Sequence, residues 1–400
     1  MQREKTKRFA VAAIFATPTA VWSSTIMNPC LSAIYHEFQD SNDFLQMFLV
    51  TGASLLSIPL ALLGGRFSRK FGKKELLTIS VLVYFLGCFG GAFSPNIEWL
   101  TVTRTIGGAT AALTQLLAFS IITDLEPEQK QRGKLMGFYL GLNSIYGAVI
   151  SLLSGILAKS DWRYSFFLNG FAVVALIMVV FFLPKASQQE ETVRNDMSLE
   201  PERGTAKREL YTLFFTSFYY STVGAGMYFL IDLYVTESSL GTSVLSGLLT
   251  ACITVVSASV SFCFGQIYVK LKRYTQPLSF AILAVSYLLY WVPGSLPVVF
   301  LATALYGCAF ALYSGFNPIR ISELAPASKL TAYLSVQTAA GFGGMFLCGY
   351  FPDFLKRLTG TETLRAILPL IAVLLSACAL MLLIQIRREI RKKNSISGIL

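Results

Sequence analysis

Long apolar stretches alternate with short polar or charged segments along the whole chain. A helix needs about 20 mostly apolar residues to cross the hydrocarbon core of a bilayer, so each stretch predicts one membrane-spanning helix. Twelve stretches together predict an all-α polytopic membrane protein with twelve transmembrane helices. They cover residues 9–35, 44–65, 75–93, 98–122, 134–158, 164–184, 210–235, 243–268, 276–293, 297–319, 330–352 and 365–386.

One break between these stretches is longer and more polar than the others. Residues 185–208 mix both signs of charge and contain no aromatic side chain, which predicts a cytoplasmic linker. We therefore expect an N-terminal six-helix half at 1–184 and a C-terminal six-helix half, with a cytoplasmic tail, at 209–400. Gly65 and Gly265 each precede a basic cluster at corresponding places in the two halves, and duplicated halves are typical of transporters.

The basic residues are distributed very unevenly between the two sides of the predicted bundle. Of the 33 Lys and Arg, 27 fall in segments on one side, 5 on the other, and Arg104 lies within a stretch. This is the positive-inside pattern, so both termini are predicted to be cytoplasmic and the protein to be a multi-pass protein of the cell membrane. The net charge of +11 follows from that pattern and does not indicate a nucleic-acid partner.

The composition leaves little room for chemistry outside the bundle. Only 14% of residues are charged, against about 25% in soluble domains. All seven cysteines lie in apolar stretches without a CxxC pair, so we predict no disulfide, metal or cofactor. Because HExxH, HxxxD and nucleotide-binding loops are missing, a membrane-embedded enzyme or lipid-handling protein is only a remote alternative. We expect a monomer in the lipid bilayer.

Arg104 is the only ionisable side chain well inside an apolar stretch. A charge at the bilayer centre costs about 2.5–3.5 kcal/mol on insertion scales, so such residues usually face a protein interior or an aqueous cavity. The alternative is that the side chain reaches the interface near Trp99 by snorkelling. The pattern alone leaves both interpretations open.

Four local motifs resemble those of the major facilitator superfamily, particularly its drug-efflux branches. The loop after the second stretch matches at Gly65, Gly72, Lys73, Lys74 and Leu77, with Arg69 at the family's acidic position. The fourth stretch matches at Arg104, Gly108, Ala111 and Ala112, with Gly107 and Thr110 as departures. The first stretch matches at Thr25, Ile26, Asn28, Leu31 and Ile34, with Ser23 and Ser32 replacing the family's acid and proline. The sixth begins with Trp162, Arg163, Phe166 and Asn169 in register.

The resemblance implies a secondary transporter that works by alternating access and exchanges drugs for protons. It also implies conformational or coupling roles for Gly65, Gly72, Lys73 and Arg104. The fifth stretch keeps Gly141, Gly147 and Gly155 but has no Gly-Pro pair, which efflux antiporters tend to carry there. Uptake or facilitated diffusion of a small neutral metabolite therefore stays open as the alternative.

Polar and aromatic side chains recur at helical spacing in the first, fourth, seventh and tenth stretches. Gln115 returns to nearly the face of Arg104 at about 100° per residue, and the tenth stretch presents one aromatic and hydroxyl face beginning at Thr303. Such faces suit hydrophobic or cationic ligands through stacking and cation–π contacts. The predicted substrate-binding residues are Ser24, Asn28, Arg104, Gln115, Tyr219, Tyr220, Tyr306, Phe310, Tyr313 and Asn317.

The acidic residues are placed in loops or at the ends of stretches. Asp124 and Glu323 fall at cytoplasmic ends, and Asp232 near the outer end of the seventh stretch. These three are the candidates for coupling to protons, although each is expected first as an ordinary helix-end or loop charge. The function predicted is multidrug or metabolite efflux of small amphiphilic molecules, with protons as the coupling ion that the family implies.

Overall fold

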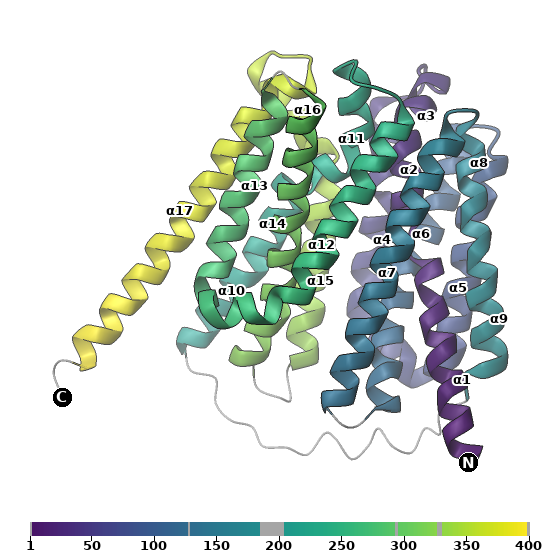
Figure 1. The fold of residues 1–400 in the computed structure, drawn as a ribbon, viewed down its shortest axis with the longest axis horizontal. Helices are drawn as coiled ribbons and strands as arrows, with labels where there is room; N and C mark the ends of the chain where they lie inside the picture. Colours follow the sequence, from purple (N-terminus) through teal and green to yellow (C-terminus); the bar gives the residue numbers. More distant parts are fainter. Residues whose placement is uncertain (1, 127–128, 185–203, 293–294, 326–329, 398–400) are drawn as a thin grey trace. The chain divides into compact units, whose positions relative to one another are not determined.

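The protein is described by a computed structural model over residues 2–126, 129–184, 204–292, 295–325 and 330–397. Every regular element in these ranges is helical (Figure 1). The main helices are α1 (Gln2–Ala16), α2 (Ser23–Met27), α3 (Leu31–Glu37), α4 (Asp43–Phe71), α5 (Lys73–Gly90), α6 (Ile97–Leu125), α7 (Gln129–Ala158), α8 (Trp162–Phe166), α9 (Ala172–Phe182), α10 (Gly204–Tyr219), α11 (Gly226–Glu237), α12 (Ser243–Leu271), α13 (Thr275–Trp291), α14 (Leu296–Leu324), α15 (Leu330–Leu347), α16 (Tyr350–Thr359) and α17 (Leu364–Ser397).

The helices confirm the prediction of an all-α polytopic membrane protein. Within the described ranges, 9 helical segments are long and apolar enough to cross a membrane. One of them, Ser243–Trp291, contains both α12 and α13 and so covers two predicted stretches. The predicted stretches at 210–235 and 330–352 are helical too, as α10 with α11 and as α15. The arrangement is consistent with twelve spans.

Two predicted spans are interrupted where their sequence disfavours a regular helix. The first span is divided into α1, α2 and α3 by 3-10 turns at Thr17–Ala20 and Asn28–Cys30, which contain Pro18 and Pro29. Proline lacks the backbone N–H that a helix interior needs. In the seventh span a π-helical turn, Tyr220–Gly224, separates α10 from α11. Both interruptions place irregular backbone in the middle of a span, where functional sites are common.

The described chain forms two compact units. The first contains Met1–Ala251 with Leu324–Phe351, and the second contains Cys252–Glu323 with Pro352–Leu400. Because the first unit includes helices from both predicted six-helix halves, the division into halves at 184 and 209 stays a prediction. Most of the predicted linker at 185–208 lies outside the described residues. Its last five residues are helical, because α10 begins at Gly204.

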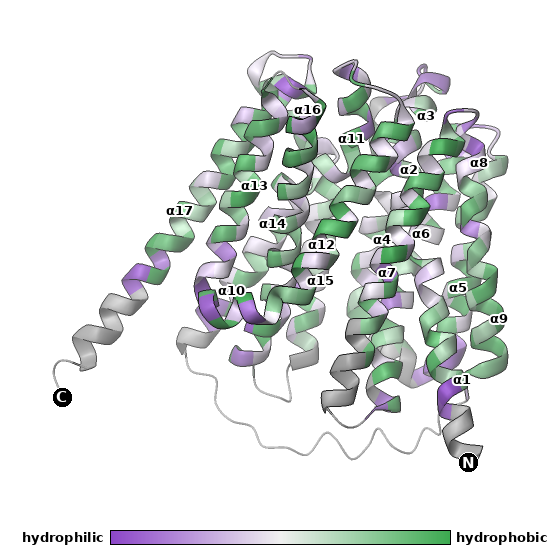
Figure 2. Cartoon of the chain, in the orientation of Figure 1, coloured by the Kyte–Doolittle hydropathy of each residue, from purple (hydrophilic) through white to green (hydrophobic). Residues whose placement is uncertain are grey.

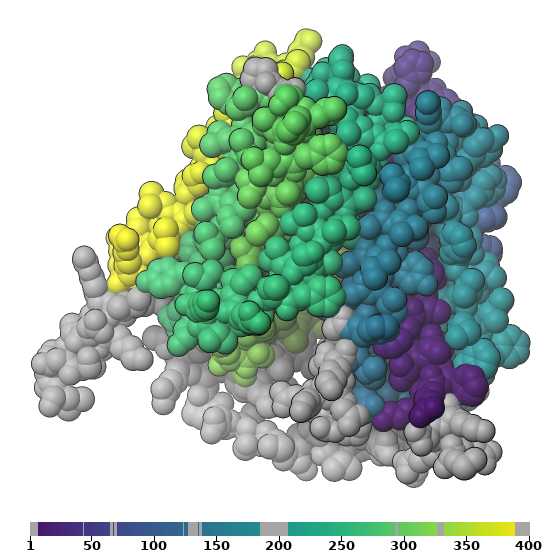
Figure 3. Space-filling model, in the orientation of Figure 1, coloured from purple at the N-terminus to yellow at the C-terminus, as the bar shows by residue number. Residues whose placement is uncertain are grey.

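The N-terminal part of the first unit has its own apolar core. Side chains of α1, α5, α6 and α9 meet there, including Ile14, Leu77, Leu117 and Val179. Figure 3 shows the side chains of α1 between those of α7 and α9 on the visible face. In a water-soluble protein, burying a side chain of this size stabilises the fold by about 1.5–3 kcal/mol. In a bilayer, helix association depends instead on the close packing of such side chains.

Apolar side chains also cover the outer faces of the helices. On α9, Val174, Ile177 and Phe181 are exposed at a spacing of three and four residues, so they form one stripe. Figure 2 shows α9 as predominantly hydrophobic along its length. A helix that is apolar on its exposed face as well as its buried face is suited to lipid contact.

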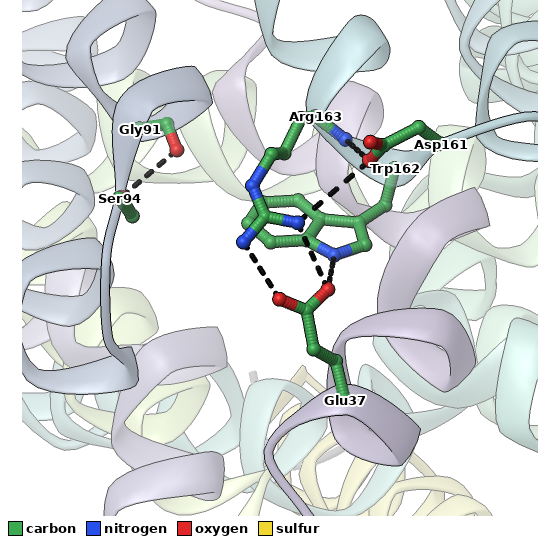
Figure 4. Close-up of polar contacts among 6 residues, drawn as sticks. All are labelled: Glu37, Gly91, Ser94, Asp161, Trp162 and Arg163. Carbon is green, nitrogen blue, oxygen red and sulfur yellow. Dashed lines mark hydrogen bonds and ion pairs between the residues drawn. The ribbon is translucent and has the colours of Figure 1, made fainter.

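The motif Trp162-Arg163 fastens the C-terminal end of the first span, where α3 ends. Arg163 Nη1 and Nη2 donate to the two carboxylate oxygens of Glu37 at 2.9 and 2.6 Å, and Trp162 Nε1 donates to the same carboxylate at 2.6 Å (Figure 4). The guanidinium also lies 4.4 Å from the Trp162 ring centroid. Further along the motif, Asn169 accepts a hydrogen bond of 2.9 Å from Tyr84. The motif therefore carries packing and positioning.

Glycines allow α5 and α6 to touch through their backbones. A Cβ on Gly107 would lie 2.9 Å from the backbone nitrogen of Cys88, and one on Gly87 would lie 2.6 Å from the Thr103 carbonyl oxygen. Neither backbone atom can move aside without shifting its helix. Small residues at such crossings let membrane helices pack closely.

We predict that Gly107→Ala destabilises the protein, because the new methyl group overpacks a backbone contact at a cost of about 1–3 kcal/mol. Thermal unfolding of the purified protein in detergent measures this as a lower midpoint. Gly90→Ala is the matched control, since a Cβ at Gly90 has nothing within 4 Å. Equal midpoints for the two variants would contradict the packing role of Gly107.

Candidate polar site of the first, fourth and seventh spans

Arg104 on α6 is buried, with 1% of its surface exposed. Its Nη1 donates to the backbone carbonyls of Leu49 and Val50 on α4, the latter at 3.2 Å. Its Nη2 donates to Ser24 Oγ on α2 at 3.2 Å. The snorkelling interpretation is therefore wrong, because the guanidinium finds its acceptors inside the first unit, where it joins three helices.

The first span presents a line of polar side chains to the helices around it. Ser24, Asn28 and Ser32 follow one another at intervals of four residues, which places them on one face. Ser24 meets Arg104, and Asn28 Nδ2 donates to the backbone carbonyl of Tyr228 at 2.7 Å. Ser32 meets Asp232 through two hydrogen bonds. We call these three residues the polar ladder.

Asp232 on α11 is fully buried, with 0% of its surface exposed. Its Oδ2 accepts hydrogen bonds from the backbone N–H and the hydroxyl of Ser32, at 2.8 and 2.5 Å. Its Oδ1 accepts a hydrogen bond of 2.5 Å from the hydroxyl of Ser246 on α12. The expectation of an ordinary helix-end charge is therefore wrong for Asp232, because these partners hold the acid in the interior.

Beside the ladder, α7 and α12 cross at very short range. Ser151 Oγ on α7 donates to the Gly247 carbonyl at 2.9 Å, and Ser243 Oγ on α12 donates to the Gly155 carbonyl at 3.2 Å. A Cβ on either glycine would lie 3.2 Å from the Cα of the other. The reciprocal pattern requires glycine at both positions, and so gives Gly155, noted above in the fifth span, a packing role.

The tenth-span face lies in the second unit, and two of its side chains contact α13. Thr303 shares a hydrogen bond of 2.8 Å with the Tyr290 hydroxyl, and Tyr313 lies edge-on to Phe280 at 6.4 Å between ring centroids. Tyr306 and Asn317 are also buried, whereas Phe310 is 40% exposed. The periodicity correctly placed these residues on one face, but Thr303 and Tyr313 on that face contact a neighbouring helix.

The predicted cytoplasmic residues form two ion pairs. Lys73 Nζ lies 2.7 Å from Asp124 Oδ2, so the loop after α4 is tied to the end of α6 even though Arg69 occupies the family's acidic position. Gly72 has a φ of +86°, which favours glycine at this turn. In the second unit Glu323 lies 2.6 Å from Arg320 and accepts a hydrogen bond of 2.8 Å from Tyr268.

The other predicted site residues have less specific surroundings. Gln115 on α6 is half-buried, and Gly65 lies within α4. Tyr219 stacks on Phe215 at 6.1 Å, and Tyr220 is buried at the start of the π-helical turn. Among the described residues, no group of three or more His, Cys, Asp or Glu is placed to hold a metal ion.

Residues 13–349 match the sequence model of the Major Facilitator Superfamily. The chain belongs to the Major Facilitator Superfamily. This family consists of membrane transporters and not of enzymes. The resemblance noted in its loop and span motifs is thereby confirmed.

Curated relatives align with about half of this chain. It is 28% identical over 189 residues to the puromycin resistance protein pur8 of Streptomyces alboniger, which covers 47% of this chain and 37% of that protein. It is 27% identical over 211 residues to the class H tetracycline resistance protein of Pasteurella multocida, covering 52% and 51%. The aligned parts thus span about half or less of these relatives.

Solved structures agree on the fold. The inward-open xylose transporter XylE from E. coli superposes with a TM-score of 0.68 at 17% identity, covering 94% of both chains. The D-xylose-proton symporter superposes with a TM-score of 0.72 at 17% identity, covering 94% of this chain and 96% of that one. At this level of identity the likeness concerns the fold alone.

Several residues of the site could not be found from sequence patterns. Ser32 was visible only as a departure from the family's proline, and Ser246 and Tyr228 carried no signal for a contact with the first span. Thr25 and Tyr228 share a hydrogen bond of 2.7 Å between their hydroxyls. A hydroxyl in an apolar stretch is a common packing residue, so its partner has to come from the three-dimensional structure.

We predict that Arg104→Ala abolishes transport with the protein level unchanged, and that Arg104→Lys lowers transport about tenfold or more. A lysine ammonium is a compact charge that cannot reproduce the hydrogen bonds of the planar guanidinium to its three acceptors. Hydrogen bonds to charged groups contribute about 1.5–3 kcal/mol each. Transport in cells, normalised to protein in the membrane, measures the effect. Ser24→Ala removes one neutral acceptor and should retain most activity; wild-type transport by Arg104→Ala would refute a role for the arginine.

Proposed function

We propose that this transporter exports small amphiphilic molecules, hydrophobic or cationic, from the cytoplasm in exchange for protons. The observation that carries the proposal is Asp232, a buried carboxyl group whose three hydrogen-bond donors come from two serines. Burial disfavours the charged form of such a carboxyl group, whereas hydrogen bonds from three donors stabilise that form, so the two effects oppose each other. That property is what a proton carrier needs.

The names of the relatives support the direction and the substrate class. The names of two relatives describe resistance to puromycin and to tetracycline. The excess of basic residues on one side supports a cell-membrane location with both termini in the cytoplasm. With that orientation, export means movement from the basic side to the side where α3 ends.

The polar ladder supports alternating access as the mechanism. Ser24 joins the first span to α6, whereas Asn28 and Ser32 join it to α11. The first span thus connects helices predicted to belong to opposite six-helix halves, and its 3-10 turn at Asn28–Cys30 lies between these contacts. Asn28 Oδ1 in the ladder and Arg104 Nε beside it are buried without a hydrogen-bond partner among the described residues, so these two atoms are available to bind a polar part of a substrate.

The Asp232 role predicts a specific loss of coupling. In everted vesicles with an acidic interior, the wild type should accumulate ethidium, puromycin or tetracycline, whereas Asp232→Asn should lose this gradient-driven accumulation by about tenfold or more, since the amide cannot carry a proton. Exchange of substrate without a gradient should survive in the variant, because the amide is nearly isosteric with the acid. Accumulation is followed by fluorescence or radiolabel.

Ser246→Ala is the matched control, because it removes one hydrogen bond to Asp232 and keeps the acid. It should remain coupled. If the wild type accumulated these drugs equally with and without the pH gradient, the proposed exchange for protons would be overturned. Transport of a neutral sugar into the cell with no movement of the three drugs would instead favour the uptake alternative.

A further inference from the structure

Four aromatic rings join α4 to the end of α15 and the start of α16. Phe44 and Phe48 on α4 lie 5.8 Å apart between ring centroids, and Phe346 and Tyr350 lie 5.5 Å apart. Across the helices, Phe48 lies 6.1 Å from Phe346, and Phe44 lies 5.6 Å from Tyr350. Each ring therefore contacts two others in a closed circuit, which we call the aromatic quartet.

The two cross-helix contacts have favourable ring geometry. Phe48 and Phe346 meet edge to face with an interplanar angle of 79°, and Phe44 and Tyr350 are stacked at 30°. Aromatic pairs prefer these edge-to-face and offset-stacked arrangements because of the charge distribution of the rings. The quartet is thus a specific attachment between α4 and the α15–α16 segment.

The backbone beside the quartet is adapted to this contact. A Cβ at Gly349 would lie 2.7 Å from Thr51 Cγ2 on α4, so the glycine between Phe346 and Tyr350 lets the segment reach α4. A Cβ at Gly52 would lie 2.6 Å from the Phe48 ring, which therefore lies against bare backbone. Larger residues at either position would force the rings apart.

The quartet lies at the outer rim of the transporter. It occupies the first turns of α4, whose opposite end leads into the basic loop at Gly72 and Lys73. Phe44 is 59% exposed, so the circuit reaches the surface. Because α4 and α15 are the second and eleventh predicted spans, the quartet connects the two predicted halves.

We propose that the aromatic quartet is a clasp that holds the outer end of the transporter closed and has to part each time it opens outward. Phe48 and Phe346 are then positioning residues that set the balance between outward-closed and outward-open states. This inference rests on the alternating access of the proposed function and adds to it the residues that control the outer rim.

The chemistry of the rings suits a joint that opens repeatedly. Separating two rings leaves no buried donor or acceptor unsatisfied, whereas parting a buried hydrogen bond does. One aromatic pair shifts an equilibrium by about two- to tenfold. Removing one cross-helix pair should therefore shift the closed and open populations by a similar factor without unfolding the helices.

Hydrogen–deuterium exchange of the purified full chain, followed by mass spectrometry, tests the clasp without a substrate. Phe48→Leu and Phe346→Leu keep an apolar side chain but remove a ring. Both should raise exchange about two- to tenfold in peptides covering 43–52 and 344–351. Both should also lower exchange at the opposite end, in peptides beginning at Gly72, because opening one end closes the other.

Phe93→Leu is the matched control. Phe93 also belongs to a ring cluster, lying 5.9 Å from Phe89 and 5.7 Å from Phe167, but that cluster lies within the N-terminal half. Its removal should change exchange only near residue 93. The double variant of Phe48 and Phe346 should shift less than the sum of the two single variants, since both remove the same contact.

Gly349→Val provides a second route to the same state, because its side chain should wedge the segment away from Thr51. It should reproduce the two-ended exchange pattern, whereas Gly265→Val, where a Cβ has nothing within 4 Å, should not. Unchanged exchange at the outer peptides, or increased exchange at both ends, in the Phe48, Phe346 and Gly349 variants would overturn the clasp. A two-ended response with no proton-coupled transport of the drugs in vesicles would leave the clasp standing and refute the proposed function.

Discussion

The burial of one cation constrains how α2, α4 and α6 meet in the first unit. Arg104 is 1% exposed, and a buried charge is costly unless hydrogen-bonded, so its guanidinium needs acceptors from the protein. Two of these are the backbone carbonyls of Leu49 and Val50, which fixes the upper part of α4 against α6. Phe48 is the residue before Leu49, so the same bonds that satisfy the charge also place a ring of the aromatic quartet.

The polar ladder keeps this cation separate from the buried acid. Arg104 meets the first span at Ser24 and Asp232 meets it at Ser32, eight residues further on, which corresponds to about 12 Å along a helix. Each charge has neutral partners instead of forming an ion pair with the other. A change of charge at Asp232 therefore removes none of the hydrogen-bond acceptors of Arg104.

Helical periodicity and charge predicted the parts of this structure that depend on local sequence. The length of the apolar stretches predicted the spans. The position of Arg104 in such a stretch left burial and snorkelling open, and the structure shows that the side chain is buried. The surroundings of Asp232 were not predictable, because its partner Ser32 lies 200 residues away and either residue alone is unremarkable in sequence. For the same reason the tenth-span face was recognised, but not the helix it meets: periodicity shows that Thr303 and Tyr313 share a face, and only the structure shows α13 against it.

The aromatic quartet, the α7–α12 contact and the hydrogen bonds of Asp232 differ in the free energy that their separation costs. The rings of Phe48 and Phe346 have no hydrogen-bonding groups, so they separate without losing a hydrogen bond. The reciprocal serine–carbonyl bonds of α7 and α12 leave four polar groups to be satisfied, and the carboxyl group of Asp232 loses three donors. Unsatisfied buried groups cost about 1–3 kcal/mol each and more when charged, so these inner contacts can separate only as water or substrate reaches them. On the proposed mechanism, opening therefore begins at the aromatic quartet and proceeds inward as the polar groups become hydrated.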